Sequence, residues 1–120
     1  MSGLVLALPV LPGKSELWLR AIQEMLDSRL GAYEASRQAQ GVTREIGWLA
    51  QTRQGEIAFV YLETADTLAT LARLAESGEA FDCWFRQQLH DINGVDLDRP
   101  APGWPGELIY EWNCNHSEEY

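Results

Sequence analysis

Residues 43–51 read TREIGWLAQ, residues 52–55 read TRQG and residues 56–63 read EIAFVYLE. The first and third stretches are rich in β-branched and aromatic residues, and the polar stretch between them ends in glycine. Two strand-like runs joined by a short polar loop with glycine are typical of a β-hairpin. The sequence therefore predicts a hairpin at the centre of the chain.

Helical patterns flank this hairpin. Apolar residues at three- and four-residue spacing predict a helix over residues 15–40, with a bend or break at Gly31, where glycine costs about 1 kcal/mol. After the hairpin, Thr64 or Asp66 is a suitable N-cap for a second helix. A further helical piece is predicted over residues 81–93.

Two more strands complete the plan. The nearly continuous apolar run over residues 4–11 predicts a first strand, and residues 107–112 predict a last one. The order strand, helix, strand, strand, helix, strand is the βαββαβ plan of ferredoxin-like domains. We therefore expect an α+β fold with a four-stranded antiparallel sheet.

The composition indicates one folded domain. The chain has 120 residues, of which 46% are hydrophobic, and we expect a domain over residues 1–112 followed by a polar, acidic tail over residues 113–120. The formal net charge of −9 opposes contact with phosphate groups, so we expect neither nucleic acid nor an anionic membrane surface as a partner. No apolar run reaches the roughly 18 residues of a membrane helix.

Cysteine usage bears on compartment and metals. Cys83 and Cys114 are the two cysteines of the chain and form no disulfide framework, which predicts a reduced, cytoplasmic protein. The pair Cys114 and His116 offers too few ligands for structural zinc, which takes four. We expect no metal and no cofactor.

Both sides of the expected hairpin are apolar. With a three-residue loop over residues 53–55, one side carries Glu45, Gly47, Leu49, Phe59 and Tyr61. The other carries Ile46, Trp48, Ala50, Ala58, Val60 and Leu62, and we rank its aliphatic members as facing the helices. Helices cover one face of such a sheet, and a large exposed apolar face is an interface. We therefore expect a homodimer through the sheet face that carries Phe59, although a one-residue slip of the loop would exchange the faces.

Three features resemble the dimeric α+β barrel superfamily. They are the turn Pro12-Gly13-Lys14-Ser15 before a long helix, the hairpin with residues 45–48 and 59–61, and the helix over residues 81–92 that leads to residues 95–97. This superfamily includes stress-responsive barrel domains, small monooxygenases of the antibiotic-biosynthesis type and chlorite-dismutase-like proteins. The chain is most similar to a bacterial family of unknown function within it.

This resemblance implies a homodimer with a pocket between sheet and helices, used for small aromatic or polyketide-like molecules or for haem. The family of unknown function often has acidic and histidine residues clustered at the start of the helix before the last strand. Asp82, His90 and Asp91 are what this chain retains of such a cluster.

Glu45 is the first candidate catalytic residue. A carboxylate desolvated among apolar strand residues has a raised pKa and suits a general base. Tyr61, expected on the same side, would donate a hydrogen bond to Glu45 or to a ligand, and Gly47 would leave room for that ligand. In the structural alternative, Glu45 lies exposed at the strand end and pairs with an arginine.

His90 is the second candidate catalytic residue. Asp82, Arg86 and His90 recur every four residues, which places them on one face of a helix. Such a face binds an acid or moves a proton, or it is simply a solvated polar face.

Aromatic residues are candidates for a ligand-binding wall. Trp48, Phe59, Tyr61 and Trp84, with Arg86, are the expected ligand-binding residues, and core packing is the alternative role of the aromatic rings. We expect a small-molecule-binding protein or a cofactor-independent enzyme acting on a small aromatic or polyketide-like compound. The alternative is a non-catalytic dimerisation or ligand-sensing module.

Overall fold

The computed structural model describes residues 2–99 and 105–114. Within them the chain is an α+β fold with a three-stranded antiparallel sheet and four α-helices. The elements in chain order are β1 (Ser2–Pro9), α1 (Ser15–Leu26), α2 (Leu30–Ala39), β2 (Val42–Thr52), β3 (Gly55–Thr64), α3 (Thr67–Glu76), α4 (Ala80–Gln88) and a π-helical turn, η1 (Leu89–Asn93).

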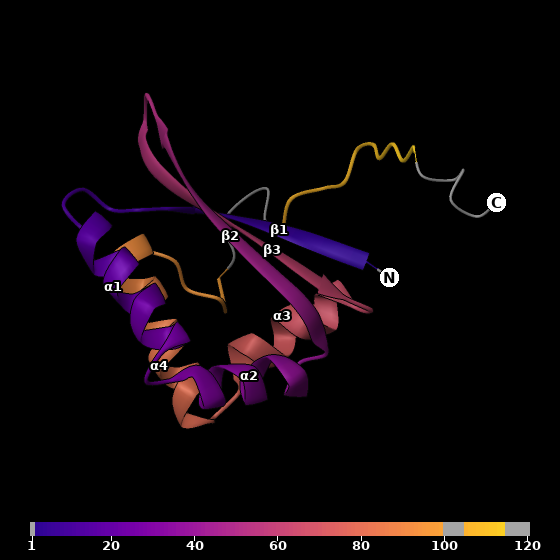
Figure 1. Cartoon of the computed structure of the whole chain (residues 1–120), viewed down its shortest axis with the longest axis horizontal. Coiled ribbons are helices and arrows are strands. Elements are labelled where there is room, and N and C mark those ends of the chain that lie inside the picture. The colour runs from indigo at the N-terminus through magenta and orange to yellow at the C-terminus, as the bar shows by residue number, and fades with distance from the viewer. Residues whose placement is uncertain (1, 100–104, 115–120) are drawn as a thin grey trace.

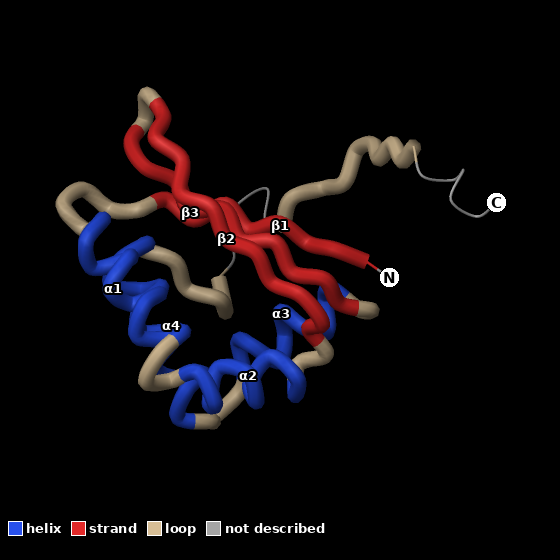
Figure 2. Tube along the Cα trace, viewed as in Figure 1, coloured by secondary structure: helices blue, strands red, loops and turns tan. Residues whose placement is uncertain are grey.

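The sheet has the strand order β1-β3-β2, and the helices lie on one side of it (Figures 1 and 2). The core between these two layers is formed by alternate residues of each strand and by apolar residues of the helices. It includes Leu4, Leu6 and Leu8 from β1, Ala58 and Leu62 from β3, Trp18 from α1 and Leu89 and Ile92 from η1. The opposite side of the sheet, which we call the open face, carries no helix in the described part of the chain.

The hairpin predicted from the sequence is present, but its predicted register is wrong. Thr52 pairs with Gly55, so the loop consists of Arg53 and Gln54 rather than three residues. Gly55 has φ of 113°, a conformation that favours glycine, and it already belongs to β3. The pairing on β2 is therefore shifted by one residue, and Trp48 lies opposite Phe59.

This shift exchanges the faces of β2 and leaves those of β3 as predicted. Ala58, Val60 and Leu62 lie on the helix side, and Phe59 and Tyr61 lie on the open face. The predictions for β2 are wrong because a one-residue slip turns every side chain to the other face. Glu45, Gly47 and Leu49 face the helices, whereas Ile46, Trp48 and Ala50 belong to the open face.

The long helix predicted over residues 15–40 is interrupted, as expected, but not at Gly31. The break falls at residues 27–29, and Gly31 lies in the first turn of α2. The backbone N–H of Arg29 donates to the carbonyl oxygen of Glu24 at 3.0 Å, and its side-chain Nε donates to the Glu24 carboxylate at 2.6 Å. After this break α2 leads directly into β2, and its Arg37 side chain bonds to Glu45 of that strand.

Polar side chains fix two of the helix ends. Asp66 caps α3, as predicted, by accepting a hydrogen bond from the N–H of Ala69 at 3.0 Å. The helix that begins at Ala80 ends at Gly94, which has φ of 65°. Just before it, the side chain of Asn93 donates to the carbonyl oxygen of Pro9 at 2.8 Å, which ties this end to β1.

The C-terminal arm (residues 105–114) contains no strand and extends away from the sheet (Figure 1). It contacts β1 through the N–H of Gly106, which donates to the carbonyl oxygen of Val5 at 2.9 Å. The fourth strand over residues 107–112 therefore stays a prediction, and residues 115–120 of the predicted acidic tail lie outside the described residues. Across residues 2–99 and 105–114, every helix is too short or too polar to cross a lipid bilayer.

Candidate functional site: the Glu45 pocket

The Glu45 carboxylate on β2 forms a nearly buried ion pair with a helix. The Nε of Arg37 donates to Glu45 Oε1 at 2.6 Å, and the hydroxyl of Tyr33 donates to the same oxygen at 2.9 Å. The exposed fractions of the two charged side chains are 6% for Arg37 and 13% for Glu45. Because little solvent screens the pair, its electrostatic attraction is stronger than that of a surface pair.

Local structure brings these three side chains together. Tyr33 and Arg37 are four residues apart on α2, so they project from the same face of the helix. On β2, Glu45 lies on the helix side of the sheet, opposite Leu62 on β3. The register of the hairpin therefore decides that this carboxylate faces α2 rather than solvent.

Aromatic rings surround the Arg37 guanidinium. Its central carbon lies 4.7 Å from the ring centre of Phe85 and 5.0 Å from that of Tyr33. Cation–π contacts of this kind stabilise a desolvated guanidinium. Arg37 is thus held by one anion and by aromatic faces, which fixes the position of the Glu45 oxygen that it contacts.

Tyr33 is kept in its protonated, hydrogen-bond-donating form. Burial raises the pKa of its hydroxyl, and the nearby Glu45 charge and the hydrogen bond to it raise that pKa further, while Arg37 opposes the shift. A phenol that donates to a carboxylate resists ionisation because the product would place two negative charges side by side.

A pocket of about 270 Å³ adjoins this group. It lies between α1 and the β2–β3 hairpin, and Glu45 and Tyr33 form its polar part. The rest of the lining is largely apolar and includes Trp18, Ile22, Met25, Gly47, Trp48 and Phe59. An apolar cavity with a few fixed polar groups is the usual form of a small-molecule site.

Gly47 contributes space to this pocket. It lies on the helix side of β2, opposite Val60. A Cβ atom at this position would meet the carbonyl oxygen of Phe59 at 3.8 Å, an ordinary van der Waals contact. A side chain is therefore compatible with the backbone here and would occupy part of the pocket.

His90 lies in a different, exposed groove. This groove of about 420 Å³ is lined by Cys83, Arg86, His90 and Asp96, among others, and shares no lining residue with the Glu45 pocket. His90 Nδ1 lies 3.0 Å from the Asp91 carboxylate. That hydrogen bond, with a further contribution from Asp96, raises the pKa of His90. The two candidate catalytic residues therefore belong to separate sites.

Asp82 does not share a surface with Arg86 and His90. It is 2% exposed and accepts hydrogen bonds from the hydroxyls of Ser36 and Ser77. Arg86 instead donates to the carbonyl oxygen of Leu74 at 2.8 Å and to Cys83 Sγ at 3.4 Å. Asp82 thus joins α2 to the start of α4 in the interior.

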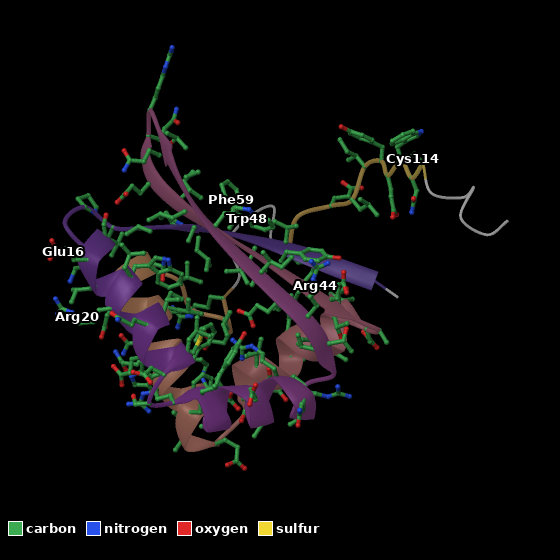
Figure 3. The ribbon with its side chains drawn as sticks, in the orientation of Figure 1. Glu16, Arg20, Arg44, Trp48, Phe59 and Cys114 are labelled. Carbon is green, nitrogen blue, oxygen red and sulfur yellow. The ribbon has the colours of Figure 1, made fainter. Side chains whose placement is uncertain are left out.

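The remaining predicted ligand-binding residues lie in three places. Trp48 and Phe59 line the Glu45 pocket, although their register pairs them on the open face (Figure 3). Tyr61 lies on the open face and donates to Glu63 at 3.0 Å, a bond that raises the Tyr61 pKa. Trp84 packs against Phe81, with the guanidinium of Arg29 4.2 Å from its ring centre.

A larger groove of about 670 Å³ lies between α2, the end of α3 and the start of α4. Its walls include the alanines at positions 32, 35 and 39, and Asp82, Ser36 and Gln40 also line it. These polar groups are bonded to one another. Because its polar groups serve to join helices, this groove is a weaker candidate site than the Glu45 pocket.

Comparisons with family models, with curated proteins and with solved structures find no match to this chain. Within the described residues, no three His, Cys, Asp or Glu side chains are grouped so as to hold a metal ion. The chemistry of the site is therefore argued from its own geometry.

Sequence reasoning singled out Glu45 but missed Arg37 as its partner. The available signal was the spacing of Tyr33 and Arg37, which places an aromatic ring and a cation on one helical face. Which strand residue this face meets depends on where the helix breaks and on the hairpin register. Neither of these two features was predicted correctly.

Proposed function

We propose that the protein binds a small aromatic molecule that carries a hydrogen-bond donor, in the pocket between α1 and the hairpin. The observation that carries this proposal is the Glu45 carboxylate, fixed by Arg37 and Tyr33 at the polar part of an aromatic and aliphatic pocket. Both donors meet Oε1, and Oε2 takes part in neither bond. A ligand hydroxyl or amine is the natural partner for Oε2.

The geometry favours an anchoring role for Glu45 over proton abstraction. The Arg37 guanidinium and the Tyr33 hydroxyl both donate to Glu45 Oε1, so two fixed donors already occupy this oxygen and hold the carboxylate in place. A cofactor-independent reaction on a bound aromatic compound remains the second candidate function. It would use Glu45 as the proton acceptor, because this carboxylate is the anion within the pocket lining.

Binding of 2-naphthol compared with naphthalene tests the anchoring role. The naphthol has the ring system and one hydroxyl donor, whereas naphthalene has the ring system alone. We expect the wild-type protein to bind 2-naphthol at least about tenfold more tightly, because a hydrogen bond to a charged group contributes about 1.5–3 kcal/mol. Equal affinity for the two compounds would contradict a donor-specific site.

The matched control is Glu63, another strand glutamate in an ion pair, located on the open face. In Glu45→Gln the preference for 2-naphthol should shrink, because the anionic acceptor is lost. In Glu63→Gln it should be unchanged. Equal effects of the two substitutions would mean that net charge, rather than the pocket, governs binding.

The open face supports a homodimer as the second part of the proposal. It carries apolar residues from all three strands, with Val5 42% and Trp48 56% exposed. An apolar surface of this extent on a soluble protein is typical of an interface. We propose that two copies pack sheet to sheet through this face, as in the dimeric α+β barrels that the sequence resembles. A dimerisation or ligand-sensing module without catalysis is consistent with the same face.

A further inference from the structure

The groove between α2, α3 and α4 contains a buried carboxylate without a counter-ion. Asp82 lines this groove of about 670 Å³ and is 2% exposed. Its hydrogen-bond donors are the hydroxyls of Ser36 and Ser77 and the side-chain amide of Gln40, which are all neutral. In the part of the chain that the structure describes, no ion pair includes Asp82. Buried charged groups are usually paired, so this carboxylate lacks its usual partner.

The start of α4 offsets part of this negative charge. Asp82 lies in the first turn of the helix, where the helix dipole acts like about half a positive charge. This partial charge is smaller than the full charge of a carboxylate. The dipole therefore helps to hold an anion at this position, and a cation in the groove would still be attracted by the charge that remains.

Two acceptor positions at this carboxylate and beside it are also unused. A carboxylate has about four acceptor sites, and Asp82 uses two on Oδ1, for Ser36 and Gln40, and one on Oδ2, for Ser77. Gln40 is 3% exposed and lines the same groove, and its Oε1 has no hydrogen-bond partner within the described residues. Because Gln40 Nε2 donates to Asp82 Oδ1 at 3.4 Å, Oε1 of the same amide lies beside the carboxylate. Both positions lack a donor.

The walls of the groove suit a compact apolar body with a positive charge. The apolar lining includes Phe81 of α4 and three alanines of α2, Ala32, Ala35 and Ala39. The charged lining has three acidic residues and one basic residue, namely Glu76, Glu79, Asp82 and Arg73. This excess of negative charge attracts a cation. The volume of the groove is within the range of about 300–1,000 Å³ that is usual for small-molecule sites.

We propose that this groove binds a small organic cation that has a primary ammonium group on a compact apolar body. An ammonium group carries one positive charge and three N–H donors. It therefore supplies what Asp82 and Gln40 lack, by donating to Asp82 Oδ2 and to Gln40 Oε1. The groove shares no lining residue with the Glu45 pocket, so this second site is independent of the proposed function.

Titration with cyclohexylammonium and with cyclohexanol tests the proposal. The two molecules have the same ring, and the amine is protonated at neutral pH. The side-chain amide signal of Gln40 in ¹H–¹⁵N NMR spectra reports binding in the groove. We expect a saturable shift of this signal and a dissociation constant at least about tenfold lower for cyclohexylammonium than for cyclohexanol. Equal affinities would overturn the proposal. A Gln40 signal that the ammonium leaves unchanged would mean that water alone satisfies these acceptors, and would overturn it too.

Two pairs of variants separate the groove from the overall charge of the protein. Ala35→Leu fills the groove from an exposed helix position and should raise the cyclohexylammonium dissociation constant at least about tenfold. Ala72→Leu, at an exposed alanine of α3 outside the groove, should leave it unchanged. Asp82→Asn should abolish the preference for the ammonium over cyclohexanol. Glu34→Gln removes one negative charge from α2 outside the groove and should preserve that preference. Wild-type affinity in Ala35→Leu, or equal effects of Asp82→Asn and Glu34→Gln, would overturn the proposal.

Discussion

Arg37 on α2 donates its Nε to Glu45 Oε1 on β2 at 2.6 Å, and both side chains are almost completely buried. This single bond connects the helical layer to the edge strand of the sheet and fixes a carboxylate beside an apolar pocket. The proposed ligand anchor and part of the stability of the fold therefore depend on the same pair.

Glu45→Gln should destabilise the protein by about 2–4 kcal/mol, because it leaves the buried Arg37 charge without its counter-ion. Urea unfolding measures the loss. Glu63→Gln breaks the Arg44 pair, whose arginine side chain is 61% exposed, and should cost less than about 1 kcal/mol. Similar losses for both would mean that Arg37 and Glu45 are coupled no more strongly than a surface pair.

Gly47→Val should abolish binding of 2-naphthol without unfolding the protein. The valine side chain would occupy the pocket, and a Cβ at this position makes only an ordinary contact. Ala50→Val, on the same strand but on the open face, is the control and should bind normally. Retained binding in the Gly47→Val protein, measured by tryptophan fluorescence, would place the ligand elsewhere.

Tyr33 should make stability fall at high pH. The Tyr33 pKa is raised in the folded protein above the ordinary value of 10.0, so Tyr33 makes its full contribution to the free energy of unfolding below pH 10. Above pH 10 the tyrosine ionises first in the unfolded chain, and this stabilising contribution is lost as the pH rises toward the folded-state pKa. Tyr33→Phe should be less stable than wild type at neutral pH, and the difference should narrow above about pH 10. Urea unfolding of both proteins across this pH range measures the difference in their free energies of unfolding. A difference that stays constant with pH would contradict the account.

Asp91→Asn should lower the pKa of His90. The hydrogen bond that His90 donates to the Asp91 carboxylate is the largest cause of the raised pKa, and Asp96 adds a smaller electrostatic contribution. NMR titration of the His90 ring protons measures the change directly. Asp98→Asn alters an acidic residue of the same groove and is the control. An equal shift of the His90 pKa in this variant would show that the overall charge of the groove, rather than the Asp91 hydrogen bond, sets the pKa.

Phe59→Glu should convert the proposed dimer to a monomer or to aggregate, because it places a charge in the middle of the open face. Leu68→Glu changes an exposed leucine on α3 and should leave the dimer intact. Native mass spectrometry distinguishes the two species. A Phe59→Glu dimer of unchanged stability would remove the open face from the interface.

Three of the predicted strands and the helical segments could be predicted from local patterns, whereas the faces of β2 could not. Alternating apolar residues and the cap at Asp66 are local signals, and they located β3 and α3. The side of the sheet on which Glu45 lies depends on whether Gly55 closes the loop or starts the strand, a difference of one residue. Both sides of β2 are apolar, so the hydrophobic pattern did not decide between the two registers.

The partners of Glu45 depend on tertiary structure in the same way. Arg37 meets it because the chain breaks at residues 27–29 and α2 turns toward β2. The sequence marked a weak point at Gly31, close to the break, but the Arg29 bonds to Glu24 that accompany the break carry no sequence signal of their own. His90 and Arg86 line one groove, as their spacing suggested. Asp82 instead turns inward and accepts hydrogen bonds from Ser77, five residues before it, and from Ser36, which is distant in sequence.

The most direct test of the proposed function follows the Met25 methyl group by NMR in protein labelled with ¹³C at its methionine methyls. Met25 is 5% exposed and lines the Glu45 pocket, so 2-naphthol bound there must lie close to it. We predict a saturable shift of the Met25 signal, with nuclear Overhauser contacts between the methyl and naphthyl protons. A Met25 signal that stays unchanged while 2-naphthol binds would contradict the proposed ligand site. A complete lack of 2-naphthol binding would contradict it as well.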